Sequence, residues 1–69
     1  MKIFAIRLKE ARKKQSLTQE ELARELNISW NTYKAYETVG KGQTMPKPAM
    51  IVKIAELLDT TTDYLLGKD

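Results

Sequence analysis

The chain has 69 residues, no cysteine, no histidine and a formal net charge of +3. Its length suits one small domain and excludes an active-site cleft between two domains or a nucleotide-binding α/β fold. The missing residue types exclude disulfides, thiolate metal sites and the commonest general base, and the excess of Lys and Arg mildly favours an anionic partner.

Apolar residues recur with a helical period along the whole chain, and no run alternates as a strand would. Phe4, Leu8 and Ala11 step by four and three residues, which predicts a first helix over about residues 2–14. Residues 1–18 hold six cations and one anion, so this segment carries +5 of the charge. The positive charge is therefore concentrated at one end of the sequence, as in an electrostatic binding surface or a solvated lysine face.

A second helix is marked by its start. Thr18 and Glu21 have the spacing of a capping box, which predicts a helix over about residues 19–26. Asn27 tolerates the left-handed conformation that ends helices. Ser29 is a good N-cap for a third helix that begins almost at once. Because the gap is so short, the two helices must cross at a steep angle.

In the second half of the chain, glycine and proline predict where helices are interrupted. Two glycines and a proline predict a loop over residues 38–47. Apolar residues spaced by three and four predict a fourth helix near residues 48–58. Thr60 or Thr61 caps a last short helix that Gly67 ends. The expected fold is therefore all-α, a compact bundle of five short helices.

Residues 18–38 are the most informative part of what we expect to be a single domain over residues 1–69. Two short helices joined by a tight turn are typical of a helix-turn-helix unit, whose second helix enters the major groove of DNA. Ala23 supplies the small side chain needed where the helices approach, and Ile28 fills the space beneath the turn. This segment therefore predicts a DNA-binding unit.

The sequence resembles the Cro and lambda-repressor-like (XRE-type) helix-turn-helix family over nearly its whole length. The segments that carry the resemblance are Leu8 to Arg12, Leu17 to Ala23, Ile28 with Ser29, Tyr36 with Glu37, Pro46, Ile54 to Leu58 and Asp63 to Gly67. The sequence LTQEELA followed by IS and YE is fairly specific for this family. This chain departs from it at Asn27, where glycine is usual, and in a longer segment between Glu37 and Pro46.

The resemblance implies that double-stranded DNA is the partner and that the lambda-repressor-like domain reads it with the second and third helices. The implied base-reading residues are Gln19, Trp30, Asn31 and Lys34. The implied backbone-contacting residues are Ser29, Thr32, Lys41, Gln43 and Thr44. The amide of Asn31 matches the N6/N7 edge of adenine, and Lys34 can reach guanine acceptors or a phosphate. Arg12 is expected to pair with Glu37.

These residues also have interpretations that do not involve DNA. Trp30 stands where a polar base reader is common in the family, and a lone tryptophan is often a partner contact or part of a core. Gln19, Asn31 and Lys34 also suit solvated helix positions. Three tyrosines are expected in the core: Tyr33, Tyr36 and Tyr64.

The leading hypothesis is a sequence-specific DNA binder, a repressor or other transcription regulator of phage or mobile-element type. One reading helix covers few base pairs, so we expect a homodimer on a near-palindromic operator. Tyr64, Leu65 and Leu66 are candidates for dimer contacts, with closure of the core as the alternative. The other function class that suits this fold is a protein-interaction module, such as an antitoxin or a bridging adaptor.

No catalytic constellation is present, and we expect the protein not to be an enzyme. No cofactor, metal or small-molecule ligand is expected in this domain. No apolar run approaches the length of a bilayer span, and we expect a cytoplasmic location without a membrane partner. Many members of the family continue into a second domain, so the chain also suits the N-terminal domain of a longer repressor.

Overall fold

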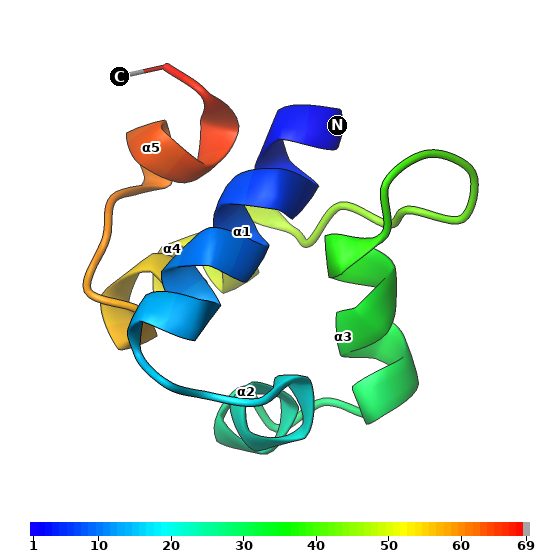
Figure 1. Cartoon of the computed structure of the whole chain (residues 1–69), viewed down its shortest axis with the longest axis vertical. Helices are drawn as coiled ribbons and strands as arrows, with labels where there is room; N and C mark the ends of the chain where they lie inside the picture. Colours follow the sequence, from blue (N-terminus) through cyan, green and yellow to red (C-terminus); the bar gives the residue numbers. More distant parts are fainter. Residues whose placement is uncertain (69) are drawn as a thin grey trace.

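The computed structural model describes residues 1–68 and, within them, contains five helices and no strand (Figure 1). The helices are α1 (Lys2–Lys14), α2 (Gln19–Glu25), α3 (Trp30–Glu37), α4 (Pro48–Leu57) and α5 (Thr62–Leu66). This confirms the expected all-α fold of five short helices. Helices α2 and α4 each end one residue earlier than predicted, because Leu26 and Leu58 serve as their C-caps.

Local hydrogen bonds explain where the short helices begin. The Thr18 hydroxyl accepts from the Glu21 amide at 3.0 Å, and the Glu21 carboxylate accepts from the Thr18 amide at 2.8 Å, so the predicted capping box is confirmed. The hydrogen bonds with Thr18, first of all the one from its backbone, lower the pKa of Glu21. Ser29 caps α3 in a similar way through the amide of Thr32, at 3.1 Å. Thr61 rather than Thr60 caps α5.

The turn between α2 and α3 is built on Asn27, whose φ of 58° lies in the left-handed region. The Asn27 amide donates to the carbonyl of Arg24, and the Ile28 amide donates to that of Ala23, both at 3.0 Å. These bonds satisfy carbonyls that the end of α2 would otherwise leave without partners. Asn27 therefore supplies the left-handed residue that this turn requires, as the sequence predicted.

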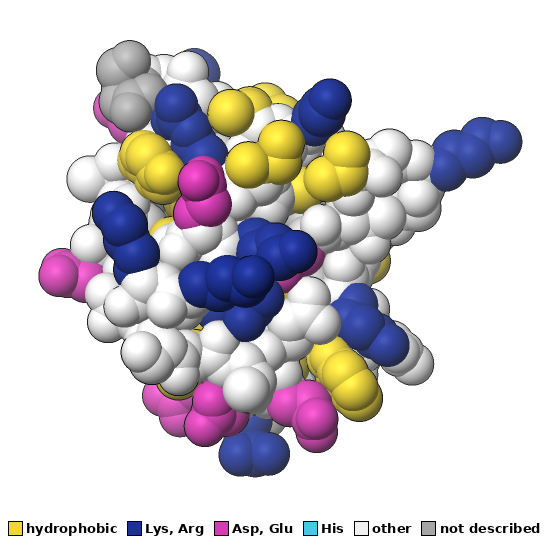
Figure 2. Space-filling model, in the orientation of Figure 1, with side chains coloured by type: hydrophobic (Ala, Val, Ile, Leu, Met, Phe, Trp, Pro, Cys, Tyr) yellow, Lys and Arg dark blue, Asp and Glu magenta, His cyan; other side chains and the backbone are white. Residues whose placement is uncertain are grey.

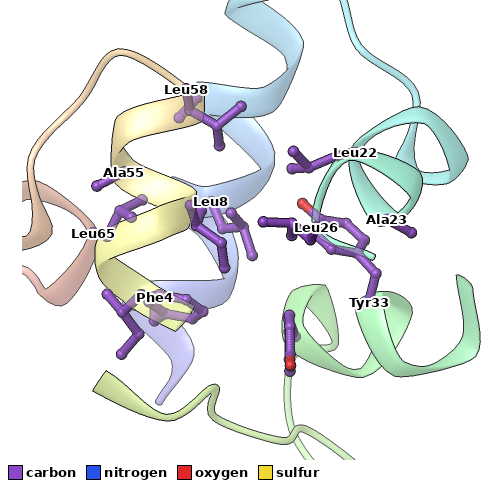
Figure 3. Packing of buried hydrophobic residues seen from close by; sticks show 13 residues of the cluster. Phe4, Leu8, Leu22, Ala23, Leu26, Tyr33, Ala55, Leu58 and Leu65 are labelled. Atoms are coloured by element: carbon purple, nitrogen blue, oxygen red, sulfur yellow. The ribbon is translucent and has the colours of Figure 1, made fainter. Parts of the chain in front are cut away.

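The core lies between α1 and the other four helices, and α1 runs through the middle of the molecule (Figure 1). Figure 3 shows apolar side chains from every helix meeting there. The residues with fully or almost fully buried side chains are Phe4, Leu8, Leu22, Leu26, Tyr33, Ile54, Leu58 and Leu65. Each helix is too short to be stable alone, so this shared apolar burial provides most of the stability.

Two expectations about the end of the chain are corrected or refined. Leu65 has no exposed surface, so its side chain closes the core and does not face a second copy of the chain. Tyr64 lies at the edge of the core rather than inside it. The guanidinium of Arg7 covers the Tyr64 ring at 4.5 Å and donates to the Tyr64 carbonyl at 2.7 Å, which fastens α5 to α1.

None of the helices in residues 1–68 combines the length and the apolar character that a membrane crossing requires.

Candidate nucleic-acid interface

Helix α3 has a buried side and an exposed side. Tyr33 and Tyr36 point into the core, with their rings edge to face and centroids 6.0 Å apart. The other side carries Trp30, Asn31, Thr32 and Lys34, all exposed. Ser29 precedes them, and its hydroxyl also donates to the Thr32 hydroxyl at 2.9 Å. A helix with one anchored side and one polar exposed side suits insertion into a groove of DNA.

The buried end of α3 is held by an ion pair. Arg12 Nε donates to Glu37 Oε2 at 2.7 Å, and Arg12 Nη2 donates to Glu37 Oε1 at 3.2 Å. The two side chains are only 8% and 3% exposed. Arg12 Nη1 also donates to the Leu17 carbonyl at 2.7 Å, and the Tyr33 hydroxyl donates to Glu37. The expected pair is therefore present, and it ties α1, α3 and the segment before α2 together.

These contacts shift the protonation equilibria of their members in consistent directions. Burial pushes the pKa of Glu37 upward, but hydrogen bonds from Arg12, Tyr33 and Gln19 outweigh it, so the net pKa lies below the ordinary value. The hydrogen bond to Glu37 raises the pKa of Arg12. Burial, followed by the hydrogen bond to Glu37, raises the pKa of Tyr33. At neutral pH the cluster therefore holds a carboxylate, a guanidinium and a neutral phenol.

Gln19, the first residue of α2, extends this network to the surface. Its Nε2 donates to Glu37 Oε1 at 3.0 Å, and its Oε1 accepts from the indole Nε1 of Trp30 at 3.3 Å. The ammonium of Lys34 lies over the Trp30 ring, 4.4 Å from its centroid. Three of the four predicted base readers are thus in contact with one another, and Asn31 lies beside them on the same exposed side of α3.

The loop between α3 and α4 contributes the remaining predicted residues. Lys41 is exposed between Gly40 and Gly42, whose φ angles of 98° and 91° favour glycine. The Thr44 amide donates to the Ala35 carbonyl at 3.1 Å, which holds the loop against the end of α3. Figure 1 shows this loop projecting beyond α3. Lys41 therefore lies at the outer edge of the molecule, as a contact with the DNA backbone would require.

Gln43 makes structural contacts that the sequence did not predict. Its Nε2 donates to the Met1 carbonyl at 2.8 Å and more weakly to the Tyr36 carbonyl at 3.5 Å. Its amide is thus used to fasten the loop to the start of α1 and the end of α3. Nothing in the local sequence indicated this structural contact, and the role of Gln43 as a contact of the DNA backbone stays a prediction.

Charges are separated on the surface. Figure 2 shows Lys and Arg side chains gathered near the centre of one face, and Asp and Glu side chains along its lower edge, where Figure 1 places α2. The acidic residues of α2 are Glu20, Glu21 and Glu25, all exposed. A polyanion would therefore be repelled by most of α2 and attracted toward α1, α3 and the loop.

Helices α2 and α3, crossing at a tight turn and supported by α1, define a helix-turn-helix domain, and sequence comparison agrees. A profile described as helix-turn-helix matches residues 8–65. Over 63 residues the chain is 44% identical to the HTH-type transcriptional regulator ImmR of Bacillus subtilis, covering 91% of this chain and 47% of that protein. Over 62 residues it is 39% identical to the cryptic phage CTXphi transcriptional repressor RstR of Vibrio cholerae, covering 90% and 53% respectively.

A third relative, the uncharacterized HTH-type transcriptional regulator YqaE of Bacillus subtilis, is 38% identical over 64 residues, which are 93% of this chain and 53% of that protein. The chain spans about half the length of these relatives. No solved structure matches it at a significant level. The chain belongs to the helix-turn-helix family, and its resemblance to the XRE-type branch is confirmed.

Proposed function

We propose that residues 1–69 form one domain that binds a specific double-stranded DNA sequence. Through this binding the protein acts as a transcription regulator. The observation that carries this proposal is the exposed side of α3, where Trp30, Asn31 and Lys34 lie beside Gln19 on a helix whose other side is anchored in the core. Membership of the helix-turn-helix family and the printed names of the relatives support it. The same family consists of DNA-binding regulators rather than enzymes.

Each surface residue has a proposed role. Asn31 and Lys34 read base edges in the major groove, and Gln19 meets a phosphate or a base edge at the start of α2. Five residues are proposed to contact the DNA backbone: Ser29, Thr32, Lys41, Gln43 and Thr44. Backbone contacts fix the register of the domain on the duplex, while the contacts of α3 carry the sequence information.

We further propose that the protein represses transcription as a homodimer on a near-palindromic operator, where it blocks the polymerase in the cytoplasm. Support comes from RstR, which is named a phage repressor, and from the small number of base pairs that one α3 can cover. A candidate dimer surface is the groove between α4 and α5, lined by Ile51, Val52 and Leu66 among others. Leu66 remains a candidate dimer contact in this groove. Tyr64 remains a candidate outside the groove, and the buried Leu65 does not.

Selection of bound sites from random duplex DNA tests the proposal. We expect two half-sites about one helical turn apart, because a two-fold dimer presents two reading helices to one face of the duplex. The affinity for the selected site falls steeply with salt, with a log–log slope of about −0.9 for each neutralised phosphate. Failure to select any sequence, or an affinity independent of salt, contradicts the proposal and favours a protein-interaction module.

A further inference from the structure

Trp30 is an exposed tryptophan whose indole N–H and ring face both contact other side chains of the protein. The residue is 46% exposed at the start of α3. The indole N–H donates to Gln19 Oε1 at 3.3 Å, and the ammonium of Lys34 lies over the ring, 4.4 Å from its centroid. Lys34 follows Trp30 by four residues, so the two side chains share one side of the helix.

Each of these contacts removes freedom from a side chain that is expected to meet DNA. A lysine in solvent samples many rotamers, and binding must order it at an entropic cost. An indole face beneath the ammonium favours a subset of those rotamers before DNA arrives. Gln19 is restricted at both ends of its amide, since Nε2 donates to Glu37 and Oε1 accepts from Trp30. One amide N–H is left for an acceptor outside the protein.

The side chains of Gln19 and Lys34 are restricted through contacts that begin in the core. Glu37 is fixed by the buried guanidinium of Arg12, and it orients the amide of Gln19 by accepting from Nε2 rather than facing Oε1. The Gln19 oxygen therefore faces the indole N–H, and the indole ring in turn supports Lys34. The contacts form one continuous chain from Arg12 to Lys34, and within residues 1–68 Trp30 is the member that contacts the ammonium.

We propose that Trp30 is a positioning residue of the reading surface, which holds the Lys34 ammonium and the Gln19 amide in the arrangement that meets DNA. This inference rests on the proposed function and assigns Trp30 a role other than direct base reading. Its contribution to affinity then passes through Lys34 and Gln19. Trp30→Ala removes no charge, but we expect it to reduce the contribution that the charge of Lys34 makes to DNA affinity.

A double-mutant cycle on the selected operator tests this role. The variants are Trp30→Ala, Lys34→Met and the double variant, where Met keeps much of the aliphatic stem and removes the charge. We expect Lys34→Met to cost about 3- to 30-fold less affinity in the Trp30→Ala background than in the wild type, which is the size of a cation–π contact. The matched control is Lys41→Met, which removes one charge from the loop at the opposite end of α3.

Trp30→Ala and Lys41→Met are expected to combine additively within about 2-fold, because they share no contact. Additivity of the Trp30 and Lys34 changes to the same level overturns the positioning role. Trp30→Phe separates its two contacts, because it keeps a ring beneath Lys34 and loses the N–H. In a double-mutant cycle, we expect the effects of Trp30→Phe and Lys34→Met on operator affinity to show the same coupling that an intact ring would give. In a cycle with Gln19→Ala, we expect Trp30→Phe to behave like the loss of the contact, because the indole N–H is gone.

A second measurement needs no DNA. Trp30 is the only tryptophan of the chain, so a nitrogen–proton NMR spectrum contains one indole N–H signal. We expect Gln19→Ala to shift that signal and to speed its exchange with water, and Lys41→Met to leave it unchanged. An indole signal insensitive to Gln19→Ala overturns the arrangement itself. If the wild-type protein selects no duplex, the proposed function fails, whereas additivity on a tightly bound operator contradicts only the role of Trp30.

Discussion

The two sides of α3 differ in how they hold their side chains. The inner side is fixed by close packing and by a buried ion pair, through Tyr33, Tyr36 and Glu37. The outer side carries Asn31 and Lys34 in solvent. The eight residues of α3 therefore combine an inner side that holds the fold with an exposed side that we propose recognises DNA. Substitutions on the first are expected to change stability, and substitutions on the second to change DNA affinity.

The largest expected effect is on the inner side. Arg12→Met leaves the Glu37 carboxylate buried with only its Tyr33 and Gln19 partners, and breaking a buried pair in this way costs about 3–5 kcal/mol. Total stability for a domain of this size is roughly 3–10 kcal/mol, so we expect the variant to be largely unfolded or close to it. Urea denaturation followed by circular dichroism measures the loss. Lys13→Met is the matched control, because Lys13 is the exposed neighbour, and we expect a change within about 0.5 kcal/mol. A loss below about 1 kcal/mol for Arg12→Met would show that the inner side depends on apolar packing alone.

Acid weakens the same contact without a mutation. The pKa of Glu37 is lower in the folded chain than its ordinary value of 4.5, so its ionised form stabilises the fold. That contribution is complete above pH 4.5 and is lost as the pH falls through the folded-state pKa. We expect the free energy of unfolding to decrease over this range more steeply in the wild type than in Glu37→Gln, which has no group to protonate there. Equal slopes in urea titrations at several pH values would contradict this assignment, and Glu21 contributes a background common to both proteins.

The outer side is expected to show the reverse behaviour. Asn31→Ala and Lys34→Met each remove a proposed base contact, and we expect each to weaken operator binding by about 1–3 kcal/mol. The free energy of unfolding is expected to change by less than about 0.5 kcal/mol, because both side chains are exposed. Gel-shift titration and urea denaturation of the same samples compare the two quantities. A variant that loses stability and affinity together would contradict the separation of the two sides.

The smallest expected effects concern the turns on either side of α2. Ser16 and Asn27 have φ angles of 57° and 58°, in the left-handed region that most L-residues avoid. Ser16→Gly removes this strain, and after the entropic cost of glycine we expect a gain of about 0.5–1 kcal/mol. Asn27→Gly is expected to give less, because asparagine tolerates this conformation better than serine. Thermal unfolding of both variants measures the difference. A larger gain in stability for Asn27→Gly than for Ser16→Gly would contradict the prediction that Ser16 is the more strained residue.

Local signals allowed most of the fold to be predicted from the sequence. Capping boxes, N-caps and helix ends depend on residues three or four apart, so Thr18, Glu21 and Ser29 identify helix starts before any tertiary contact is known. The pairing of Arg12 with Glu37 came from the family resemblance, since the two are 25 residues apart.

The contacts that the sequence did not reveal depend on side-chain rotamers and on the angle at which helices cross. The Gln19–Glu37 and Trp30–Lys34 contacts are of this kind, and so is the use of the Gln43 amide within the protein. Leu65 shows the same limit, because in a helix of five residues the sequence does not separate a core position from a surface position. The predicted base-reading residues therefore lie near one another, while their individual orientations follow from packing.

The hydrogen bond between Gln19 and Trp30 has a consequence for how relatives with other operators arise. Asn31 is exposed and is proposed to read a base edge, so a single substitution there is expected to alter the base that is preferred. Position 30 is different, because its side chain contacts position 19 on the neighbouring helix. Divergence at these two sites is therefore expected to be concerted: across the family, residues at 19 and 30 vary as pairs, and a new operator preference that involves Trp30 requires two changes rather than one.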